Sequence, residues 1–403
     1  MPGPLEGVRV LDMTWVLLGP YATQILGDLG ADVIKIEGPE GDTTRQTGPM
    51  RNPDMGSFYL SANRNKRSIV LDMKQPAAKD ALLKLVDGAD VFVHSIRPDA
   101  IDRLGIGHEA LLARNPRLVY AAVHGFRRDG PYGGRPAYDD IIQAASGMSA
   151  LMQRVSGEML HMPMVAADKT TGLTLAYSIM AGLFHRERTG EGQFIEVPMF
   201  ETLASFTLME HAFGRTFEPP LGPPGYDRVL AKFRKPYQTS DGAYVCFLAY
   251  NDRQWRRYAE AVDRPELLTD PKFSTLKARG QNIEQVYALC AEITAERTLA
   301  HWRETFAAIE MPFMVVNDLD DLYADPHLAA TGFFQPFEHP SEGALTMPSP
   351  PTGFQKTPAS IRRHPPRLGE QSLEILAEAG LADAEIAAML GSGATADGRD
   401  QDT

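Results

Sequence analysis

A carboxylate stands at the start of a long apolar segment in the middle of the chain. Asp168 is followed by residues 169–190, whose composition predicts a buried helix. An acidic residue in this place is usually the helix N-cap, where backbone N–H groups and the helix dipole keep the carboxylate ionised at neutral pH. An ionised carboxylate is also what nucleophilic catalysis by aspartate requires. Asp168 is therefore a candidate nucleophile, although the local sequence identifies no electrophile.

Basic side chains gather near the ends of several expected strands. The run NRNKR at 63–67 enters one strand, and Lys74, Arg97 and Arg103 come after two others. Arg binds two phosphate oxygens at once and Lys supplies a point charge. In an open α/β sheet, ligands bind beyond the carboxyl ends of the strands. The run 63–67 alone is more typical of a solvated turn, but the combined set favours an anionic ligand with more than one phosphate.

Two adjacent acidic residues precede another expected helix. Asp139 and Asp140 follow a loop rich in Gly and Pro. Either is a candidate catalytic acid, although an N-cap followed by a first-turn acid is the commoner explanation.

The elements that must position these residues alternate between strand and helix. The sequence predicts strands at 8–13, 32–37, 68–71, 90–93 and 118–123, and helices at 21–29, 75–87 and 101–104. This alternation predicts an α/β fold with a largely parallel sheet. No GxGxxG follows the first strand, so a nicotinamide cofactor is not expected. Beyond a Pro- and Gly-rich stretch, we expect a smaller α+β lobe with a hairpin at 237–248 and helices at 253–261, 282–293 and 299–309.

Composition limits the classes of partner. The 403 residues carry a net charge of -12, which argues against nonspecific binding to nucleic acid or to an anionic membrane surface. Cys246 and Cys290 form neither a metal-binding spacing nor a disulfide framework. No signal peptide is recognised, and no apolar stretch reaches the ~18 residues of a membrane span. We expect a cytoplasmic protein without a metal.

Several motifs, in order along the chain, make it similar to the class III coenzyme A transferases. This family includes carnitine CoA-transferase, formyl-CoA transferase and the α-methylacyl-CoA racemases. The motifs are PLEGVRVLD at 4–12, LGDLGADVIKIE at 26–37, NKRSI at 65–69, RP at 97–98, DRLG at 102–105, RTGEGQ at 188–193 and LGE at 368–370. The resemblance implies a Rossmann-like large domain built from both chain ends, 1–200 and 330–403, a small domain at 226–325, linkers at 201–225 and 326–335, and an interlocked homodimer.

The resemblance also implies a reaction. The family's catalytic aspartate matches Asp168, whose carboxylate would attack an acyl-CoA thioester and then form an aspartyl-CoA thioester. A carboxylic acid acceptor would reverse these steps, so acyl-CoA is a substrate and no tightly bound cofactor is expected. Carried over position by position, the residues that contact coenzyme A are Val16, Leu17, Leu71, Lys74, Ser95, Ile96, Arg97, Arg103, His124, Gly125, Phe126 and Arg127.

Three functions stay open, with CoA transfer favoured. A racemase would pair the aspartate with a histidine, but the matching position holds Tyr138, a poor base at neutral pH. A CoA-binding protein without turnover is the third possibility. Trp15, Leu17 and Gly38 replace a histidine, a glutamine and an arginine of the formyl-CoA branch, which argues against oxalate as acceptor. Arg228 or Arg234 could hold the second carboxylate of a dicarboxylic substrate, and plain surface charge explains them equally well.

Overall fold

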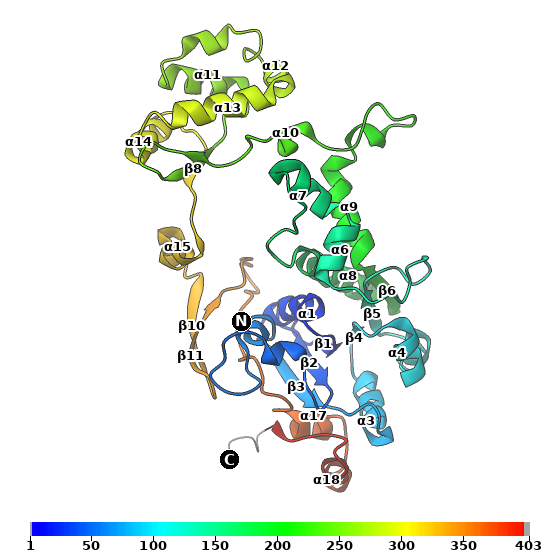
Figure 1. Cartoon of the computed structure of the whole chain (residues 1–403). Helices are drawn as coiled ribbons and strands as arrows, with labels where there is room; N and C mark the ends of the chain where they lie inside the picture. Colours follow the sequence, from blue (N-terminus) through cyan, green and yellow to red (C-terminus); the bar gives the residue numbers. More distant parts are fainter. Residues whose placement is uncertain (1, 399–403) are drawn as a thin grey trace. The chain divides into compact units, whose positions relative to one another are not determined.

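The computed structural model describes residues 2–398 and divides the chain into two compact units (Figure 1). The first unit contains the residues up to Gly147, His161–Phe206 and the residues from His327 onward. The second contains Met148–Leu160 and Thr207–Pro326. In the described residues, no helix is both long enough and apolar enough to cross a membrane.

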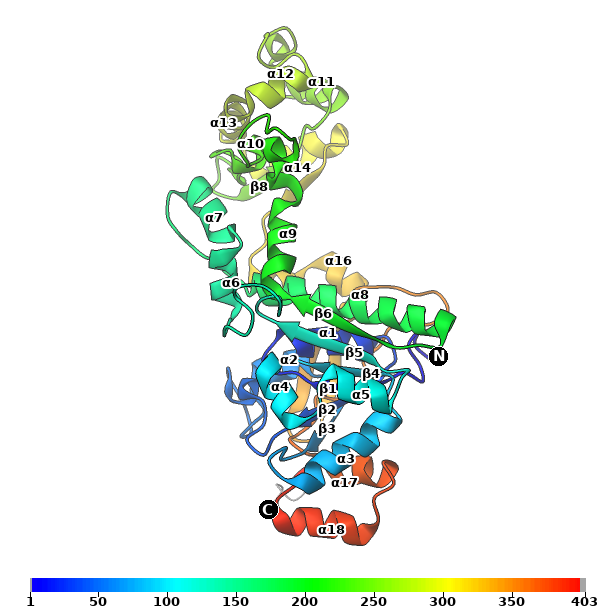
Figure 2. The same cartoon turned by 90° about the vertical axis from the view of Figure 1, so that its right-hand side faces the viewer.

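A six-stranded parallel sheet forms the centre of the first unit (Figure 2). Its strand order is β3-β2-β1-β4-β5-β6, and every neighbouring pair is parallel. The strands are β1 (Arg9–Met13), β2 (Asp32–Glu37), β3 (Lys66–Val70), β4 (Val91–His94), β5 (Val119–His124) and β6 (Gln193–Pro198). The predicted α/β class and parallel sheet are confirmed, whereas β6 was not expected from the sequence.

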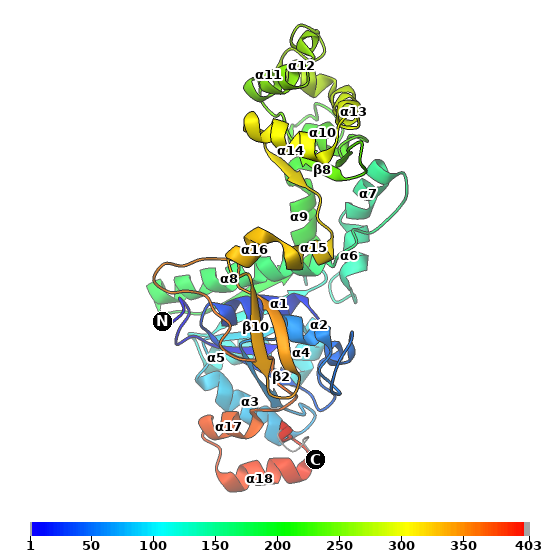
Figure 3. The ribbon, with the colours of Figure 1, turned by 90° about the vertical axis from the view of Figure 1, so that its left-hand side faces the viewer.

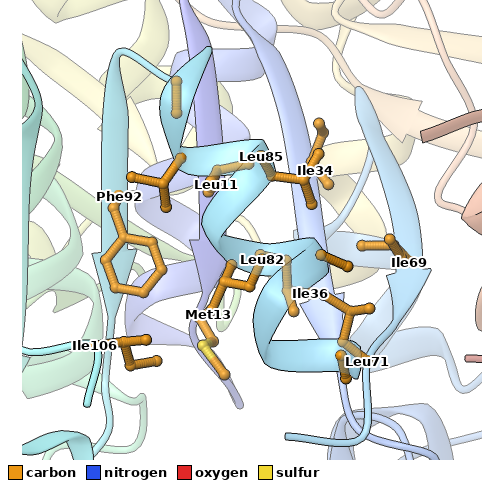
Figure 4. Close-up of a cluster of buried hydrophobic side chains, with 14 of the residues drawn as sticks. Leu11, Met13, Ile34, Ile36, Ile69, Leu71, Leu82, Leu85, Phe92 and Ile106 are labelled. Atoms are coloured by element: carbon orange, nitrogen blue, oxygen red, sulfur yellow. The ribbon is translucent and has the colours of Figure 1, made fainter. Parts of the chain in front are cut away.

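Helices cover both faces of this sheet. The helices of the unit include α1 (Leu18–Asp28), α2 (Ser57–Ala62), α3 (Pro76–Asp87), α4 (Pro98–Leu104), α5 (His108–Arg114), α6 (Asp139–Ala145), α8 (Ala166–Thr189), α17 (Ser372–Glu378) and α18 (Asp383–Ser392), and α16 (Pro326–Ala330) begins at the boundary with the second unit. On one face, α8 packs against α1, β5 and β6. On the other face, Leu82 and Leu85 of α3 lie over Leu11, Ile34 and Phe92 of the strands (Figure 4). Successive side chains of a strand point to opposite faces of the sheet, so the strands contribute to two separate apolar layers.

The start of α1 differs from the sequence expectation. The helix was expected at 21–29, but it begins at Leu18 and includes Gly19 and Pro20 in its first turn. Proline is tolerated in the first helical turn because its missing N–H would have no intrahelical acceptor there. Farther along, Gly172 of α8 lies so close to α1 that an added Cβ would be 2.8 Å from the carbonyl oxygen of Leu18. Small residues therefore bring α8, which carries Asp168, against α1.

The basic run 63–67 does not form a phosphate site. The side chains of Arg64, Lys66 and Arg67 are buried, and each forms an ion pair with an aspartate of the sheet unit. These pairs are Arg64–Asp28 at 2.7 Å, Lys66–Asp12 at 3.1 Å and Arg67–Asp32 at 2.7 Å. Unpaired charges would be too costly at this depth, so the cations are committed to internal carboxylates. Both interpretations of this run, a solvated turn and part of a phosphate site, are wrong, because the three cations are buried and paired.

The second unit has its own core. Its elements are α7 (Met148–Ser156), the second part of α9 (Met199–His211), α10 (Asp227–Leu230), α11 (Asp252–Ala261), α12 (Leu276–Gln281), α13 (Ile283–Thr294), α14 (Leu299–Ala308), α15 (Leu319–Ala324) and the antiparallel strands β7 (Tyr237–Gln238), β8 (Tyr244–Phe247) and β9 (Phe313–Val315). The predicted hairpin is confirmed by the β7–β8 pair. Trp255, Tyr258, Trp302 and Phe306 fill the core.

Two features bear on the expected linkers. Residues 201–211 lie inside helix α9, not in an irregular connection. After α16, the chain of the first unit forms an antiparallel hairpin of β10 (Phe334–His339) and β11 (Gly343–Pro348), seen in Figure 3.

Candidate active site

A cleft of about 420 Å³ opens beyond the carboxyl ends of β1, β4 and β5, within the first unit. The strand order reverses between β1 and β4, which is where open α/β sheets bind ligands. The loop after each of these strands contributes to the wall, and α8 supplies Asp168. The lining residues are Trp15, Val16, Leu17, Leu18, Ser95, Arg97, Pro98, Val123, His124, Gly125, Phe126, Gly134, Arg135, Pro136, Ala137, Tyr138, Asp168 and Met199.

A buried ion pair holds the loop after β1 in a strained conformation. Val16 has φ +66°, a left-handed value that β-branched residues rarely adopt. Its backbone N–H donates to both carboxylate oxygens of Asp42, at 3.2 and 3.3 Å. Lys35 donates to Asp42 at 2.9 Å and to the carbonyl oxygen of Thr14 at 2.9 Å. Both charged side chains are fully buried. Strain maintained in this way is typical of functional sites.

Two histidines fix the loop after β4. The backbone N–H of Ile96 donates to Nδ1 of His94 at 3.1 Å. The carbonyl oxygen of Ile96 accepts from Nε2 of His124 at 3.1 Å. Burial lowers the pKa of His124, so its imidazole is neutral at pH 7. The histidines thereby position Ser95 and Arg97 at the cleft.

Asp168 is not the N-cap of α8. The helix begins at Ala166, Val165 is the N-cap, and Asp168 is the third helical residue. Its backbone N–H donates to Oδ1 of Asp139 at 2.9 Å, so the carboxylate of Asp139 satisfies a helix N–H that has no intrahelical acceptor. Asp139 itself is the first residue of α6, not its N-cap. The sequence pattern had indicated a cap at both places and was wrong in detail at each.

A glutamine completes this arrangement. Asp139 is buried, and its Oδ2 accepts from Nε2 of Gln143 at 2.6 Å. Gln143 also donates to the carbonyl oxygen of Met164 at 3.0 Å and accepts from the backbone N–H of Met162 at 2.9 Å. The segment leading into α8 is therefore tied to α6, which holds Asp139 beside Asp168. Sequence reasoning did not identify Gln143.

The electrostatic state of Asp168 also differs from the expectation. Burial, and next the charge of Asp139, raise the pKa of Asp168 from 3.8 to about 7. Loss of hydration and a like charge both disfavour the anion, and together they outweigh the weaker influence of the helix dipole. The protonated form of Asp168 is therefore substantially populated near neutral pH. The prediction that this carboxylate is fully ionised at neutral pH is wrong.

The cleft has cations that can receive an anion. Arg97 and Arg135 line it and are exposed. Within the described residues, neither forms an ion pair with a carboxylate within 4.0 Å, so neither charge is committed to the fold. Arg135 lies 4.6 Å above the ring of Tyr132. An uncommitted guanidinium is well suited to a carboxylate or a phosphate.

The structure brings together many of the residues chosen from the sequence, but not all. The cleft contains Val16, Leu17, Ser95, Arg97, His124, Gly125, Phe126, Tyr138 and Asp168. Other expected coenzyme A contacts lie elsewhere. Leu71 is in the apolar core, Ile96 packs against that core, Lys74 and Arg103 are exposed away from the lining, and Arg127 pairs with Asp129. Arg228 and Arg234 belong to the second unit.

Other residues line the cleft although sequence reasoning assigned them no role. Arg135, Pro136 and Met199 are examples. The Gly- and Pro-rich composition of 130–136 marked a loop, which was the available signal for Arg135 and Pro136. Met199 follows β6, the strand that was not expected, so its approach to the cleft had no signal.

Comparisons with known proteins agree with this fold and cleft. The family model for CoA-transferase family III matches residues 5–372. The human succinyl-CoA:glutarate CoA-transferase is 32% identical over 382 residues, covering 93% of this chain and 86% of the relative. The formyl-CoA:oxalate CoA-transferase of Escherichia coli O6:H1 is 32% identical over 415 residues, covering 96% and 99%.

Solved structures give the same result. Rv3272 from Mycobacterium tuberculosis superposes with a TM-score of 0.79 at 28% identity, covering 92% of this chain and 98% of that chain. A CAIB/BAIF family protein from Brucella suis has a TM-score of 0.79 at 30% identity, covering 94% and 100%. The match over nearly the whole chain, together with the strand order and the cleft at its reversal point, leads to one conclusion: this chain belongs to CoA-transferase family III and is an enzyme of the CoA-transferase type.

Proposed function

We propose that this enzyme moves coenzyme A from an acyl-CoA to a carboxylic acid through a covalent intermediate on Asp168. The observation that carries the proposal is the half-buried carboxylate of Asp168 in the wall of a cleft that also exposes Arg97. A nucleophile needs access to its electrophile, and an uncommitted cation favours the anionic substrate. The high pKa of Asp168 makes its anion a more basic nucleophile than an ordinary carboxylate.

The proposed reaction exchanges bonds of similar energy. An oxygen of Asp168 attacks the thioester carbon, the C–S bond breaks, and a mixed anhydride and the CoA thiolate form. The thiolate attacks Cγ of Asp168 and releases the donor acid, leaving an aspartyl-CoA thioester. The acceptor carboxylate then attacks Cγ and expels the thiolate, which finally attacks the acceptor's carbonyl carbon. Asp168 leaves as a carboxylate, so each bond broken is matched by one formed.

The neighbours of Asp168 hold it for this chemistry. The hydrogen bond from its backbone N–H to Asp139 fixes the first turn of α8. Arg97, positioned through the histidine-fixed loop, is the cation that we assign to the phosphates of CoA or to a substrate carboxylate. Apolar side chains such as Leu17 and Phe126 would exclude water from the thioester and the anhydride.

We propose a short dicarboxylic acyl-CoA as donor and a dicarboxylic acid as acceptor. The names of two relatives include succinyl-CoA and glutarate, that of another includes succinate and glutarate, and those of others include formyl-CoA and oxalate. Trp15 and Leu17 line the cleft, and both differ from the residues of the formyl-CoA branch at these positions. This difference favours succinyl-CoA and glutarate over formyl-CoA and oxalate as substrates. Initial rates with succinyl-CoA and a series from oxalate to adipate would test this choice. A preference for oxalate would contradict it.

Trapping the intermediate tests the mechanism. The enzyme is incubated with succinyl-CoA, treated with hydroxylamine or borohydride, and digested for mass spectrometry. We expect modification at Asp168, and none in Asp168→Asn. Asp140→Asn, which changes an exposed aspartate of the nearby helix α6, is the matched control and should be modified like the parent. An active enzyme labelled elsewhere or not at all would contradict the covalent route, as would full acyl exchange by Asp168→Asn. Binding of coenzyme A by the parent without any acyl exchange would favour the CoA-binding role without turnover.

One observation favours racemisation as a second candidate. A carboxylic acid with a pKa of about 7, next to the buried Asp139, is suited to moving a proton at neutral pH. The partner that a racemase needs is not at the expected position, because Tyr138 lines the cleft there and is 72% exposed. Incubation of a 2-methylacyl-CoA in heavy water, without an acceptor acid, distinguishes the two. Deuterium at Cα would support racemisation.

We also propose the assembly that the resemblance implies. The chain mass is 44.3 kDa, and sedimentation of an interlocked homodimer should give twice this value. The domain bounds 1–200 with 330–403, and 226–325, stay predictions, as does the cytoplasmic location.

A further inference from the structure

The second unit contains two adjoining cavities that the proposed transfer reaction does not use. Their volumes are about 330 and 310 Å³. They share the lining residues Arg228, Tyr237, Phe247, Leu248 and Tyr287, so they adjoin, and we refer to the two together as the hollow. No residue of the Asp168 cleft lines either one. The combined size is in the range of small-molecule sites.

The larger cavity is aromatic. Its wall includes Phe213, Tyr226, Tyr237, Phe247, Trp255 and Tyr287. The indole N–H of Trp255 is buried and has no hydrogen-bond partner among the described residues. The surrounding protein atoms cover this nitrogen, so it does not face the cavity as a donor. The wall therefore offers apolar and aromatic contact.

The smaller cavity is cationic. Arg228, Arg234 and Lys235 line it, and no acidic residue does. Within the described residues, none of the three forms an ion pair with a carboxylate within 4.0 Å. The larger cavity adds one uncommitted acid, the exposed Asp227, and Arg279, whose charge is paired with Asp252 at 2.6 Å. Positive charge is in excess across the hollow.

Arg228 lies at the junction and is held in place. Its Nε donates to the hydroxyl of Tyr287 at 3.1 Å, and its guanidinium lies 4.6 Å from the centre of the Tyr250 ring. It lines both cavities. A positioned guanidinium loses less conformational entropy when it binds a carboxylate than a free one does.

We infer that this hollow is a binding site for an organic carboxylate with an apolar body. The carboxylate pairs with Arg228 at the cationic end, and an aryl or branched body lies among the aromatic rings near Trp255. Arg234 and Lys235 add long-range attraction at the mouth. No residue lines both this site and the acyl-CoA cleft, and binding here does not require Asp168 chemistry.

Calorimetric titration of the full-length protein tests the inference with 3-phenylpropanoate and its neutral counterpart, 3-phenylpropan-1-ol. We expect saturable binding of the acid, about tenfold tighter than that of the alcohol, because the two probes differ in the charge that Arg228 recognises. Arg228→Met should weaken binding of the acid about tenfold or more and leave the alcohol unchanged. Asp168→Asn should bind the acid like the parent, as should Arg253→Met, a change at an exposed arginine of the same unit outside both cavities.

A second readout locates the ligand and guards against misfolding. The acid should change tryptophan fluorescence in the parent and not in Trp255→Phe. Arg228→Lys, which keeps the charge but loses the planar fork, should bind the acid several-fold more weakly than the parent, and thermal melts check each variant. Equal affinity for acid and alcohol, no loss in a folded Arg228 variant, or displacement of the acid by coenzyme A would each overturn the inference.

Discussion

Replacing Asp168 by asparagine should stabilise the protein at alkaline pH and not at acidic pH. The native structure raises the pKa of Asp168 from 3.8 to about 7. At 1.36 kcal/mol per pKa unit, this difference corresponds to an upper bound of about 4 kcal/mol. Because the folded pKa is the higher one, the native state binds more protons than the unfolded state between these two values. The contribution of Asp168 to stability therefore falls as pH rises from about 4 to about 7, and stays low above that range.

Asparagine keeps the shape of the side chain and has no charge to bury. Asp168→Asn should match the parent near pH 4 and exceed it by up to about 4 kcal/mol near pH 8. Thermal melts at several pH values measure this gap, which corresponds to roughly 2 °C per kcal/mol. Asp140→Asn, at an exposed position, is the control and should show no such divergence. A gap that is the same at both pH values, or a less stable Asp168→Asn at alkaline pH, would refute the reasoning.

Three further predictions concern the surroundings of Asp168 and the sheet. Asp139→Asn removes the neighbouring charge, so the pH midpoint of transfer activity should move below the parent's value near 7, yet stay above 3.8 because burial is the larger cause. Gly172→Val places side-chain atoms against a carbonyl oxygen of α1; melts should show a loss of about 1–3 kcal/mol and assays a lower kcat. Arg45→Met leaves the buried Glu37 carboxylate without its partner at 2.7 Å, and denaturant unfolding should show a loss of about 3–5 kcal/mol. An unchanged pH midpoint would contradict the first prediction. Unchanged thermal melts would contradict the second, and unchanged denaturant unfolding would contradict the third.

The parallel sheet could be predicted from the sequence because its strands are buried on both faces. The continuous apolar run at 118–123 has this property, and the helices between the strands have clear periodicity. The strand at 193–198 was missed because Gln193 and Glu196 interrupt its apolar residues and most of it is half-buried, so no continuous apolar run marks it. The hairpin at 237–248 was predictable from its Asp-Gly turn.

The site was predictable only in part, because charge alone does not tell a ligand contact from an internal ion pair. The cations at 63–67 and Arg97 look equally suited to phosphate in the sequence. Tertiary packing places Arg64 and Lys66 against aspartates of the sheet, whereas Arg97 has no such partner and stays at the cleft. Expected contacts such as Leu71 are in the core, because the residue directly after a buried strand is often still inside it.

By itself, the sequence determined that Asp168 is acidic, that it stands near the start of a buried helix, and that it matches a family aspartate. Only the tertiary structure decided its electrostatic state. Asp139 is separated from it by 28 residues, yet the two are joined by a 2.9 Å hydrogen bond. Desolvation depends on which elements cover the side chain, and the like charge arrives from a different helix. Neither quantity is encoded in the residues next to Asp168, so a carboxylate that the local pattern indicates as fully ionised has a pKa of about 7.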